Sequence, residues 1–125
     1  ADFVVTTVPH TPETEGIWNA ERFGLFKESA YFINIGRGMT TRLDDLVGVL
    51  ESGRLAGAAL DVYEIEPLPA EHALWGMENV ILTPHVAVAD ATDLPDRRVA
   101  ILVDNARRFR DGEPLSNVVD KSRWF

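Results

Sequence analysis

The sequence predicts an α/β fold, in which a parallel sheet is doubly wound and covered by helices on both faces. Two observations support this fold class. The chain reads as strand, helix, strand, helix, strand, loop and strand, and crossovers of this kind join parallel strands. The strands are continuous apolar runs rather than strict alternations, which is typical of strands buried on both faces.

Local patterns define the first two strands and the helix between them. Residues 2–8 are apolar and β-branched, and Pro9 ends the run. Asn19 is a favourable N-cap for a short helix that extends to about Lys27. Residues 30–35 form the second strand.

The second helix has a start signal, an apolar stripe and a stop signal. Residues 41–44 resemble a capping box with Asp at its last position. Apolar side chains then follow at positions i, i+3, i+4 and i+7, the spacing of an amphipathic helix. They are Leu43, Leu46, Val47 and Leu50. Gly53 is a natural C-terminal stop for this helix.

Two further strands are predicted over residues 56–62 and 79–83. The segment between them, residues 64–77, is rich in proline and longer than most connections in compact domains. It begins where the third strand ends, which is where functional loops of parallel sheets lie.

The character of the chain changes after His85. Residues 86–96 form a connection with small residues and proline, and residues 97–110 read as a helix. We therefore divide the chain into residues 1–88, which carry the sheet, and residues 89–125, which carry a crossover helix and a tail.

Composition excludes several classes of protein. The chain has 125 residues and a net charge of −8, which argues against a nucleic-acid partner. It has no cysteine and so no disulfide, thiolate zinc site or cysteine nucleophile. The histidines are widely spaced, and no metal site is predicted. No apolar run approaches the roughly 20 residues of a membrane span and no signal peptide is visible, so we expect a cytoplasmic protein with no membrane partner.

Three side chains that follow predicted strands suggest a chemical site: Arg37, Glu66 and His85. The carboxyl ends of parallel strands share one edge, so these side chains are expected to converge. An Arg fork can clamp a carboxylate, and His with a carboxylate partner can act as acid and base. Each residue alone also fits a surface or turn position. Spacing does not choose between Glu66 and Glu64 as the partner of the histidine.

Asp61 and His10 are further candidates. Asp61 ends the third strand, where a carboxylate is desolvated unless it has partners. The carboxylate of Asp61 can either accept a hydrogen bond from a ligand amide or cap a turn. His10 lies in a polar turn near a strand end and is a candidate for lining a ligand crevice, whereas His72 is expected at the surface.

Four ordered motifs resemble the D-isomer-specific 2-hydroxyacid dehydrogenases. They are Val8-Pro9-His10-Thr11-Pro12-Glu13-Thr14, Ile33-Asn34-Ile35-Gly36-Arg37-Gly38, Gly57-Ala58-Ala59-Leu60-Asp61-Val62-Tyr63-Glu64-Ile65-Glu66-Pro67-Leu68-Pro69 and Asn79-Val80-Ile81-Leu82-Thr83-Pro84-His85. The segments Gly112-Glu113-Pro114 and Asn117-Val118-Val119 are similar to the family's C-terminal ending.

The resemblance implies a reaction and a role for each catalytic candidate. Hydride passes between NAD or NADP and a small 2-oxo acid or D-2-hydroxy acid. Arg37 binds and polarises the oxo acid, His85 is the acid–base group, and Glu66 is its partner. The presence of Glu66 disfavours the formate dehydrogenase branch, in which a Gln stands opposite the histidine.

The resemblance also implies a cofactor site. Asp61 is expected to contact the nicotinamide carboxamide, and the turn at Val8 and Pro9 to line the cofactor. The full set of implied cofactor-binding positions is Val8, Pro9, His10, Thr14, Ile35, Gly36, Arg37, Asp61 and His85.

The family's Gly-rich phosphate loop is not found in these residues and is expected upstream. Residues 1–88 then form the second half of a Rossmann domain, and residues 89–125 return to complete a substrate domain. We expect the 125 residues alone to be inactive and the full-length protein to be a homodimer. The alternative function is a dinucleotide-binding corepressor or sensor of the same family that turns over little.

Overall fold

The structure is a computed structural model that describes residues 1–88 and 92–124. The chain forms two compact units, residues 1–87 and residues 88–125, and each is described by itself. The predicted connection over residues 86–96 lies partly outside the described residues. The first unit carries the sheet, and the assignment of the second to a substrate domain stays a prediction.

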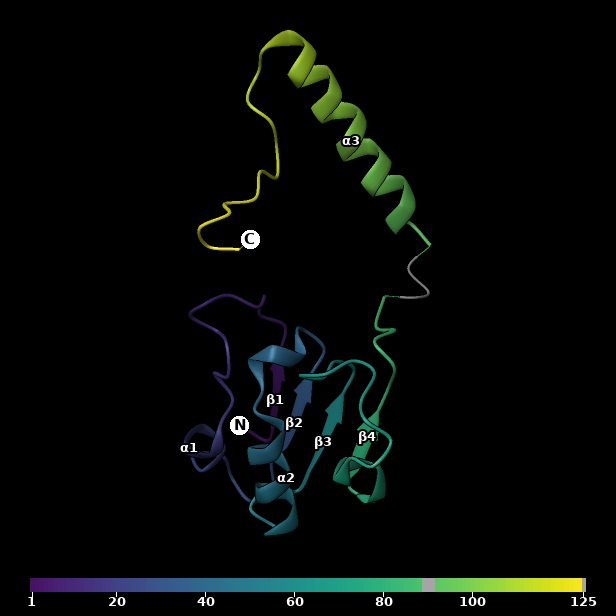
Figure 1. Ribbon diagram of the computed structural model, residues 1–125. Helices are drawn as coiled ribbons and strands as arrows, with labels where there is room; N and C mark the ends of the chain where they lie inside the picture. The colour runs from purple at the N-terminus through teal and green to yellow at the C-terminus, as the bar shows by residue number, and fades with distance from the viewer. Residues whose placement is uncertain (89–91, 125) are drawn as a thin grey trace. The chain divides into compact units, whose positions relative to one another are not determined.

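Four parallel strands form the sheet of the first unit (Figure 1). They are β1 (Phe3–Thr6), β2 (Tyr31–Asn34), β3 (Gly57–Leu60) and β4 (Val80–Leu82), paired in that order. The register aligns the last residues of all four strands: Thr6, Asn34, Leu60 and Leu82. The loops that follow the strands therefore start at one edge. The predicted parallel α/β fold is confirmed, with strands shorter than predicted.

The first helix is shorter than predicted. Helix α1 spans Ala20–Phe23, and its N-cap is Asn19, whose side chain accepts the N–H of Arg22 at 3.1 Å. Beyond Gly24 the chain continues in turns, because the N–H groups of Leu25 and Phe26 bond to carbonyls three residues back. The N-terminal signal was correct, whereas the extension to Lys27 was wrong.

Helix α2 spans Leu43–Glu51 and follows a short 3₁₀ helix, η1 (Gly38–Thr40). The predicted capping box at residues 41–44 is wrong. The N-cap is Arg42, whose side chain makes no capping bond. Instead, the N–H of Leu43 donates to Oε2 of Glu64 at 2.6 Å. A carboxylate from the loop after β3 thus caps α2.

The hydrophobic core lies on one face of the sheet, between the strands and helices α1 and α2. Its fully buried members include Phe23, Phe32, Leu46, Leu60 and Leu74. The last of these belongs to a second 3₁₀ helix, η2 (Ala73–Gly76). This layer fixes the orientation of the strands, and with them the edge from which the loops start.

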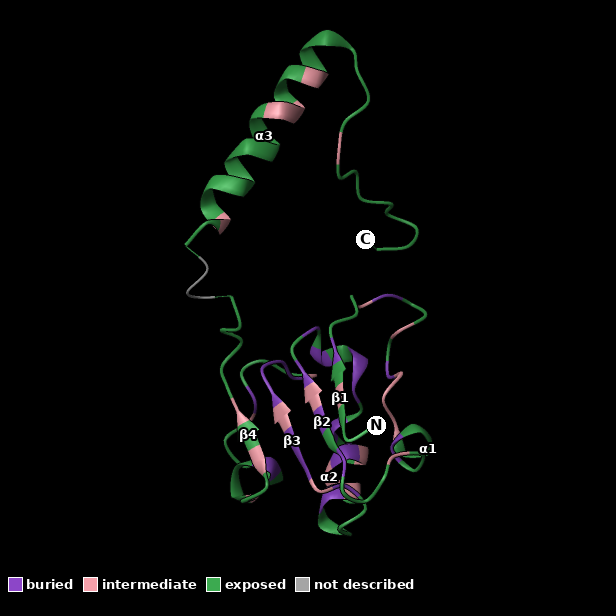
Figure 2. Ribbon diagram, turned by 180° about the vertical axis from the view of Figure 1, so that it is seen from behind, coloured by how far each residue is buried: buried purple, intermediate pink, exposed green. Residues whose placement is uncertain are grey.

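The opposite face of the sheet carries several exposed apolar side chains, and much of β1 is coloured as exposed in Figure 2. Phe3, Val5, Tyr31 and Ile81 on this face keep between 43% and 67% of their surface. Helices on both faces were predicted for the doubly wound sheet, and residues 1–87 supply helices to one of these faces. The apolar runs of the strands indicate that both faces of the sheet need to be covered by other segments. Helices α1 and α2 both lie on the other face.

The second unit contains helix α3 (Leu94–Asp111), which starts three residues earlier than predicted and has proline in its first turn. It ends at Gly112, whose φ of 71° is left-handed. None of its side chains is buried. In the described part of the chain, no helix combines the length and apolar character that crossing a membrane requires.

Candidate active site

His85 and Glu66 form a hydrogen-bonded pair at the carboxyl edge of the sheet. Glu66 lies in the loop after β3 and His85 lies just after β4, and these strands are parallel neighbours. Nδ1 of His85 is 2.8 Å from Oε2 of Glu66. No described residue hydrogen-bonds Nε2 of the imidazole. That nitrogen is therefore placed for proton transfer to a ligand.

Both oxygens of the Glu66 carboxylate are held, because Oε1 accepts the N–H of Tyr63 at 3.0 Å. Burial raises the pKa of Glu66. The hydrogen bonds from His85 and from the Tyr63 backbone, with the positive charge of the imidazolium, outweigh burial and bring the pKa below its ordinary value. Glu66 is thus an anion at neutral pH, as a group that orients and stabilises an imidazolium must be.

Asp61 clamps the turn that carries His85. Its Oδ1 accepts the hydroxyl of Thr83 at 2.6 Å and the N–H of Val86 at 2.9 Å, and its Oδ2 accepts the N–H of Ala87 at 2.9 Å. His85 lies between these partners with a φ of 55°, a left-handed conformation that is uncommon outside glycine. The clamp supports this strained backbone. The three hydrogen bonds of the clamp use Oδ2 once and Oδ1 twice.

The clamp predicts a pH-dependent stability. Burial raises the pKa of Asp61, but its three hydrogen bonds outweigh burial and lower the pKa. A lowered pKa stabilises the fold above the unfolded-state pKa, and this is lost as pH falls through the folded-state pKa. Asp61→Asn should therefore reduce the free energy of unfolding by about 1–3 kcal/mol at neutral pH and by progressively less below about pH 4. Chemical unfolding across this range measures both. Equal losses at neutral and acidic pH would contradict a charged clamp.

Tyr63 joins the ends of β3 and β4 and has no role among the sequence predictions. Its hydroxyl is directed at the carbonyls of Leu60 at 3.1 Å and Thr83 at 2.8 Å. Burial and the charge of Asp61 raise the pKa of Tyr63, so its hydroxyl remains a donor. The sequence does carry a signal for this, since a tyrosine directly after a buried strand needs a partner for its hydroxyl.

Arg37 follows β2 between two glycines. Its side chain is exposed, and Nη1 donates to the carbonyl of Gly36 at 2.7 Å. A Cβ on Gly36 would lie 2.9 Å from the carbonyl oxygen of Val8, and one on Gly38 would collide with the backbone of Tyr63. Neither glycine has a positive φ. The two glycines therefore allow backbone segments to pack closely here.

The buried side chain of Asn34 fixes the turn that presents Arg37. Its Nδ2 donates to the carbonyl of Arg37 at 3.2 Å, and its Oδ1 accepts the N–H of Gly36 at 3.0 Å. The turn is therefore held from inside the sheet, while the guanidinium stays at the surface.

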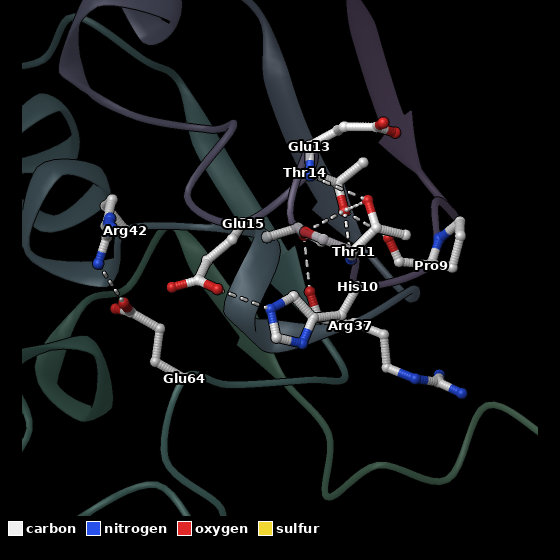
Figure 3. Close-up of polar contacts among 10 residues, drawn as sticks. Pro9, His10, Thr11, Glu13, Thr14, Glu15, Arg37, Arg42 and Glu64 are labelled. Carbon is white, nitrogen blue, oxygen red and sulfur yellow. Dashed lines mark hydrogen bonds and ion pairs between the residues drawn. The ribbon is translucent and has the colours of Figure 1, made fainter. Parts of the chain in front are cut away.

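The loop after β1 is a tight turn held by Thr14 (Figure 3). The Thr14 hydroxyl donates to the carbonyl of Pro9 at 2.7 Å and accepts the N–H of Thr11 at 2.8 Å. Nε2 of His10 is 3.2 Å from Oε2 of Glu15. Thr14, a predicted cofactor contact, thus shapes the turn, and His10 projects from it.

One cavity of about 260 Å³ collects the catalytic candidates. It is lined by His10, Arg37, Gly38, Met39, Tyr63, Glu64, Glu66 and His85. A second, more apolar cavity of about 550 Å³ shares Tyr63, Glu66 and His85 with it. The hydrogen-bonded pair of His85 and Glu66 therefore lines two cavities, one that contains Arg37 and one that is more apolar. The first has room for a small molecule beside the Arg37 guanidinium.

Glu64, the other candidate partner of the histidine, faces a different group. Its Oε2 accepts the N–H of Leu43, and its Oε1 is 3.9 Å from Nη1 of Arg42 (Figure 3). The backbone bends over residues 64–67, so the two side chains leave the loop in different directions. Glu66 thus reaches His85, while Glu64 reaches α2. Within residues 1–88 and 92–124, no cluster of three or more His, Asp or Glu side chains could hold a metal ion.

The fold and the site together define an α/β protein with a hydrogen-bonded His–Glu pair and an exposed arginine at the carboxyl edge of a parallel sheet. Residues 1–87 match the family model described as D-isomer specific 2-hydroxyacid dehydrogenase, NAD binding domain. The chain belongs to this family. The predicted resemblance is confirmed.

Named relatives and solved structures extend over nearly the whole chain. Glyoxylate/hydroxypyruvate reductase A of Escherichia fergusonii is 40% identical over 122 residues, which are 98% of this chain and 38% of that protein. The NADPH-dependent glyoxylate/hydroxypyruvate reductase of Sinorhizobium meliloti, solved with NADP and sulfate, is 41% identical with a TM-score of 0.86. The match covers 99% of this chain and 40% of that one.

A D-isomer specific 2-hydroxyacid dehydrogenase from Xanthobacter autotrophicus, solved with NADPH and MES, is 42% identical with a TM-score of 0.85. That match covers 96% of this chain and 48% of the other. This chain therefore spans less than half the length of each of these three relatives.

Proposed function

We propose that this chain supplies the acid–base part of an NAD(P)-dependent reductase of small 2-oxo acids, which also runs in reverse on D-2-hydroxy acids. One observation carries the proposal. A His85–Glu66 pair with a 2.8 Å hydrogen bond lines the same small cavity as Arg37. Relatives named as glyoxylate/hydroxypyruvate reductases support the substrate class.

Each side chain has a defined task in this reaction. Arg37 binds the carboxylate of the oxo acid and stabilises the negative charge that develops on its carbonyl oxygen. His85 donates a proton from Nε2 to that oxygen during reduction and removes it during oxidation. Glu66 holds Nδ1, which fixes the orientation of the ring. Asp61 keeps the histidine turn in place.

The residues at the strand ends fit a nicotinamide cofactor, which when bound supplies the hydride. Val8 and Ile35 follow β1 and β2 and are 37% and 45% exposed, so they would offer apolar surface to a flat ring. Asp61 has one acceptor position left for a carboxamide N–H. We infer that Pro9, His10, Thr14 and Gly36 complete this part of the cofactor site, whether the cofactor is NAD or NADP.

The remainder of the enzyme belongs to the same proposal. A Gly-rich phosphate loop from a preceding segment would complete cofactor binding, and residues 89–125 would return to a substrate domain. We further propose a cytoplasmic homodimer that binds no nucleic acid, in keeping with the charge of −8. The experiments below use this full-length protein.

A turnover assay distinguishes a reductase from a corepressor or sensor. The full-length protein should oxidise NADPH or NADH when glyoxylate, hydroxypyruvate or pyruvate is added, with kcat in the ordinary range of about 1–10³ s⁻¹. Cofactor binding should be measured alongside, by fluorescence titration. Tight binding without turnover on any of these acids would favour the sensor function and would contradict the proposal.

A further inference from the structure

We propose that Glu64 is a positioning residue, which fixes the loop bearing Glu66 relative to the turn bearing Arg37. This inference rests on the proposed reductase function. Glu64 comes from the loop after β3, and its Oε2 accepts the N–H of Leu43 at the start of α2, at 2.6 Å. The side chain is only 26% exposed. It therefore joins two loops that each carry a catalytic group.

The junction has a second contact beside the carboxylate. Gly38 passes so close to the backbone of Tyr63 that a Cβ at this position would collide with it. Gly38 follows Arg37 directly, and the N–H of Tyr63 holds Oε1 of Glu66. The close backbone contact between Gly38 and Tyr63 brings the loops after β2 and β3 together. The hydrogen bond of Glu64 then fixes how these loops are aligned.

The reach of the side chain matters more than its charge. Arg42 is 3.9 Å from the Glu64 carboxylate and is largely exposed, so its attraction is weak. The short bond to the Leu43 N–H is the directional contact. Gln can accept the same bond at the same length. Asp keeps the charge, but it is one methylene shorter and must either lose the bond or pull the loop.

The chain offers a matched control in Asp45. Its Oδ2 accepts the N–H of Ala20 at 2.9 Å, so it too is a carboxylate that caps a helix from another element. It joins α2 to α1, whereas the catalytic groups lie in the loops after β2, β3 and β4. Asp45→Ala therefore removes a comparable cap without touching the junction between the Arg37 and Glu66 loops.

The decisive experiment compares Glu64→Ala, Glu64→Asp, Glu64→Gln and Asp45→Ala with the wild type. Misplaced catalytic groups lose rate, so Glu64→Ala and Glu64→Asp should lower kcat for hydroxypyruvate reduction by about 10–100-fold. Glu64→Gln should stay within about threefold of the wild type. KM for NADPH should change little in all variants. Asp45→Ala should lower the thermal midpoint and leave kcat near that of the wild type.

Two results would contradict a positioning role for Glu64. A normal kcat in Glu64→Asp with a large loss in Glu64→Gln would show that charge, not reach, is what matters. Equal kcat losses in Glu64→Ala and Asp45→Ala would show a general structural effect. Either result overturns the proposal.

An activity-independent readout separates this inference from the function itself. Amide hydrogen exchange at Leu43 and residues 61–68 should accelerate in Glu64→Ala and Glu64→Asp but not in Glu64→Gln. In Asp45→Ala the acceleration should appear at Ala20 instead. If the wild type fails to reduce any 2-oxo acid, the proposed function fails while this pattern still tests the junction. Unchanged exchange in Glu64→Ala would contradict it.

Discussion

Replacement of His85 by alanine should lower kcat for reduction of a 2-oxo acid by about 10²–10⁴-fold, the range for loss of a positioned general acid. The imidazole is held through Nδ1 by Glu66 and presents Nε2 to the cavity that contains Arg37. Among the described residues, no other histidine both lies just after a strand and belongs to a turn that is held by a buried carboxylate, as Asp61 holds the turn at His85. Cofactor affinity, measured by fluorescence titration, should fall far less than kcat.

The two nearby glutamates supply the control for this assignment. Glu66→Gln removes the charge next to His85 and should alter the pH profile of kcat/KM, because the imidazolium loses its anionic partner. Glu64→Gln keeps the cap on α2 and should leave that profile unchanged. A His85→Ala enzyme with near-normal kcat, or a larger change in profile from Glu64 than from Glu66, would refute the assigned pair.

Replacement of Arg37 by alanine should lower kcat/KM for the oxo acid by about 10²–10³-fold, as when a donor to a developing oxyanion is removed. Arg37→Lys restores the charge but not the planar fork, so it should recover only part of this loss. It should have a raised KM for the oxo acid and a lowered kcat. Steady-state kinetics with NADPH saturating gives both values.

The position of Arg37 decides how cofactor binding should respond. The guanidinium of Arg37 is exposed, and among the described residues it donates only to the carbonyl of the preceding residue, Gly36. Replacement of Arg37 should therefore leave the fold intact. NADPH affinity should change little in Arg37→Lys and Arg37→Ala. If NADPH binding weakens as much as substrate binding, the residue belongs to the cofactor site instead.

The sheet and its loops could be predicted because their signals are local. Apolar runs followed by Gly36, Asp61 or Thr83 marked three strand ends, and parallel order then implied that Arg37, Glu66 and His85 share one edge. The structure places these three around one cavity. Their catalytic roles stay predictions, because geometry shows proximity and only kinetics shows function.

Other features could not be predicted because they depend on contacts between distant segments. The cap of α2 comes from Glu64, which is 21 residues away from Leu43, while the local pattern at Thr41 imitated a capping box. Likewise, the three bonds of Asp61 require the turn at His85 to be folded. The uncovered sheet face shows a further limit: hydrophobicity indicates that Phe3 and Ile81 need cover, but not which segment supplies it.

The most direct test of the central claim is transfer of labelled hydride in the full-length protein. The wild type and the His85→Ala variant should be incubated with glyoxylate and NADPH deuterated at C4 of the nicotinamide, and the product examined by mass spectrometry. The account predicts glycolate that carries deuterium at C2, formed by the wild type and almost absent with His85→Ala. With deuterium at both C4 positions of NADPH, glycolate that lacks deuterium at C2 in the wild type, or equal labelling by both proteins, would contradict it.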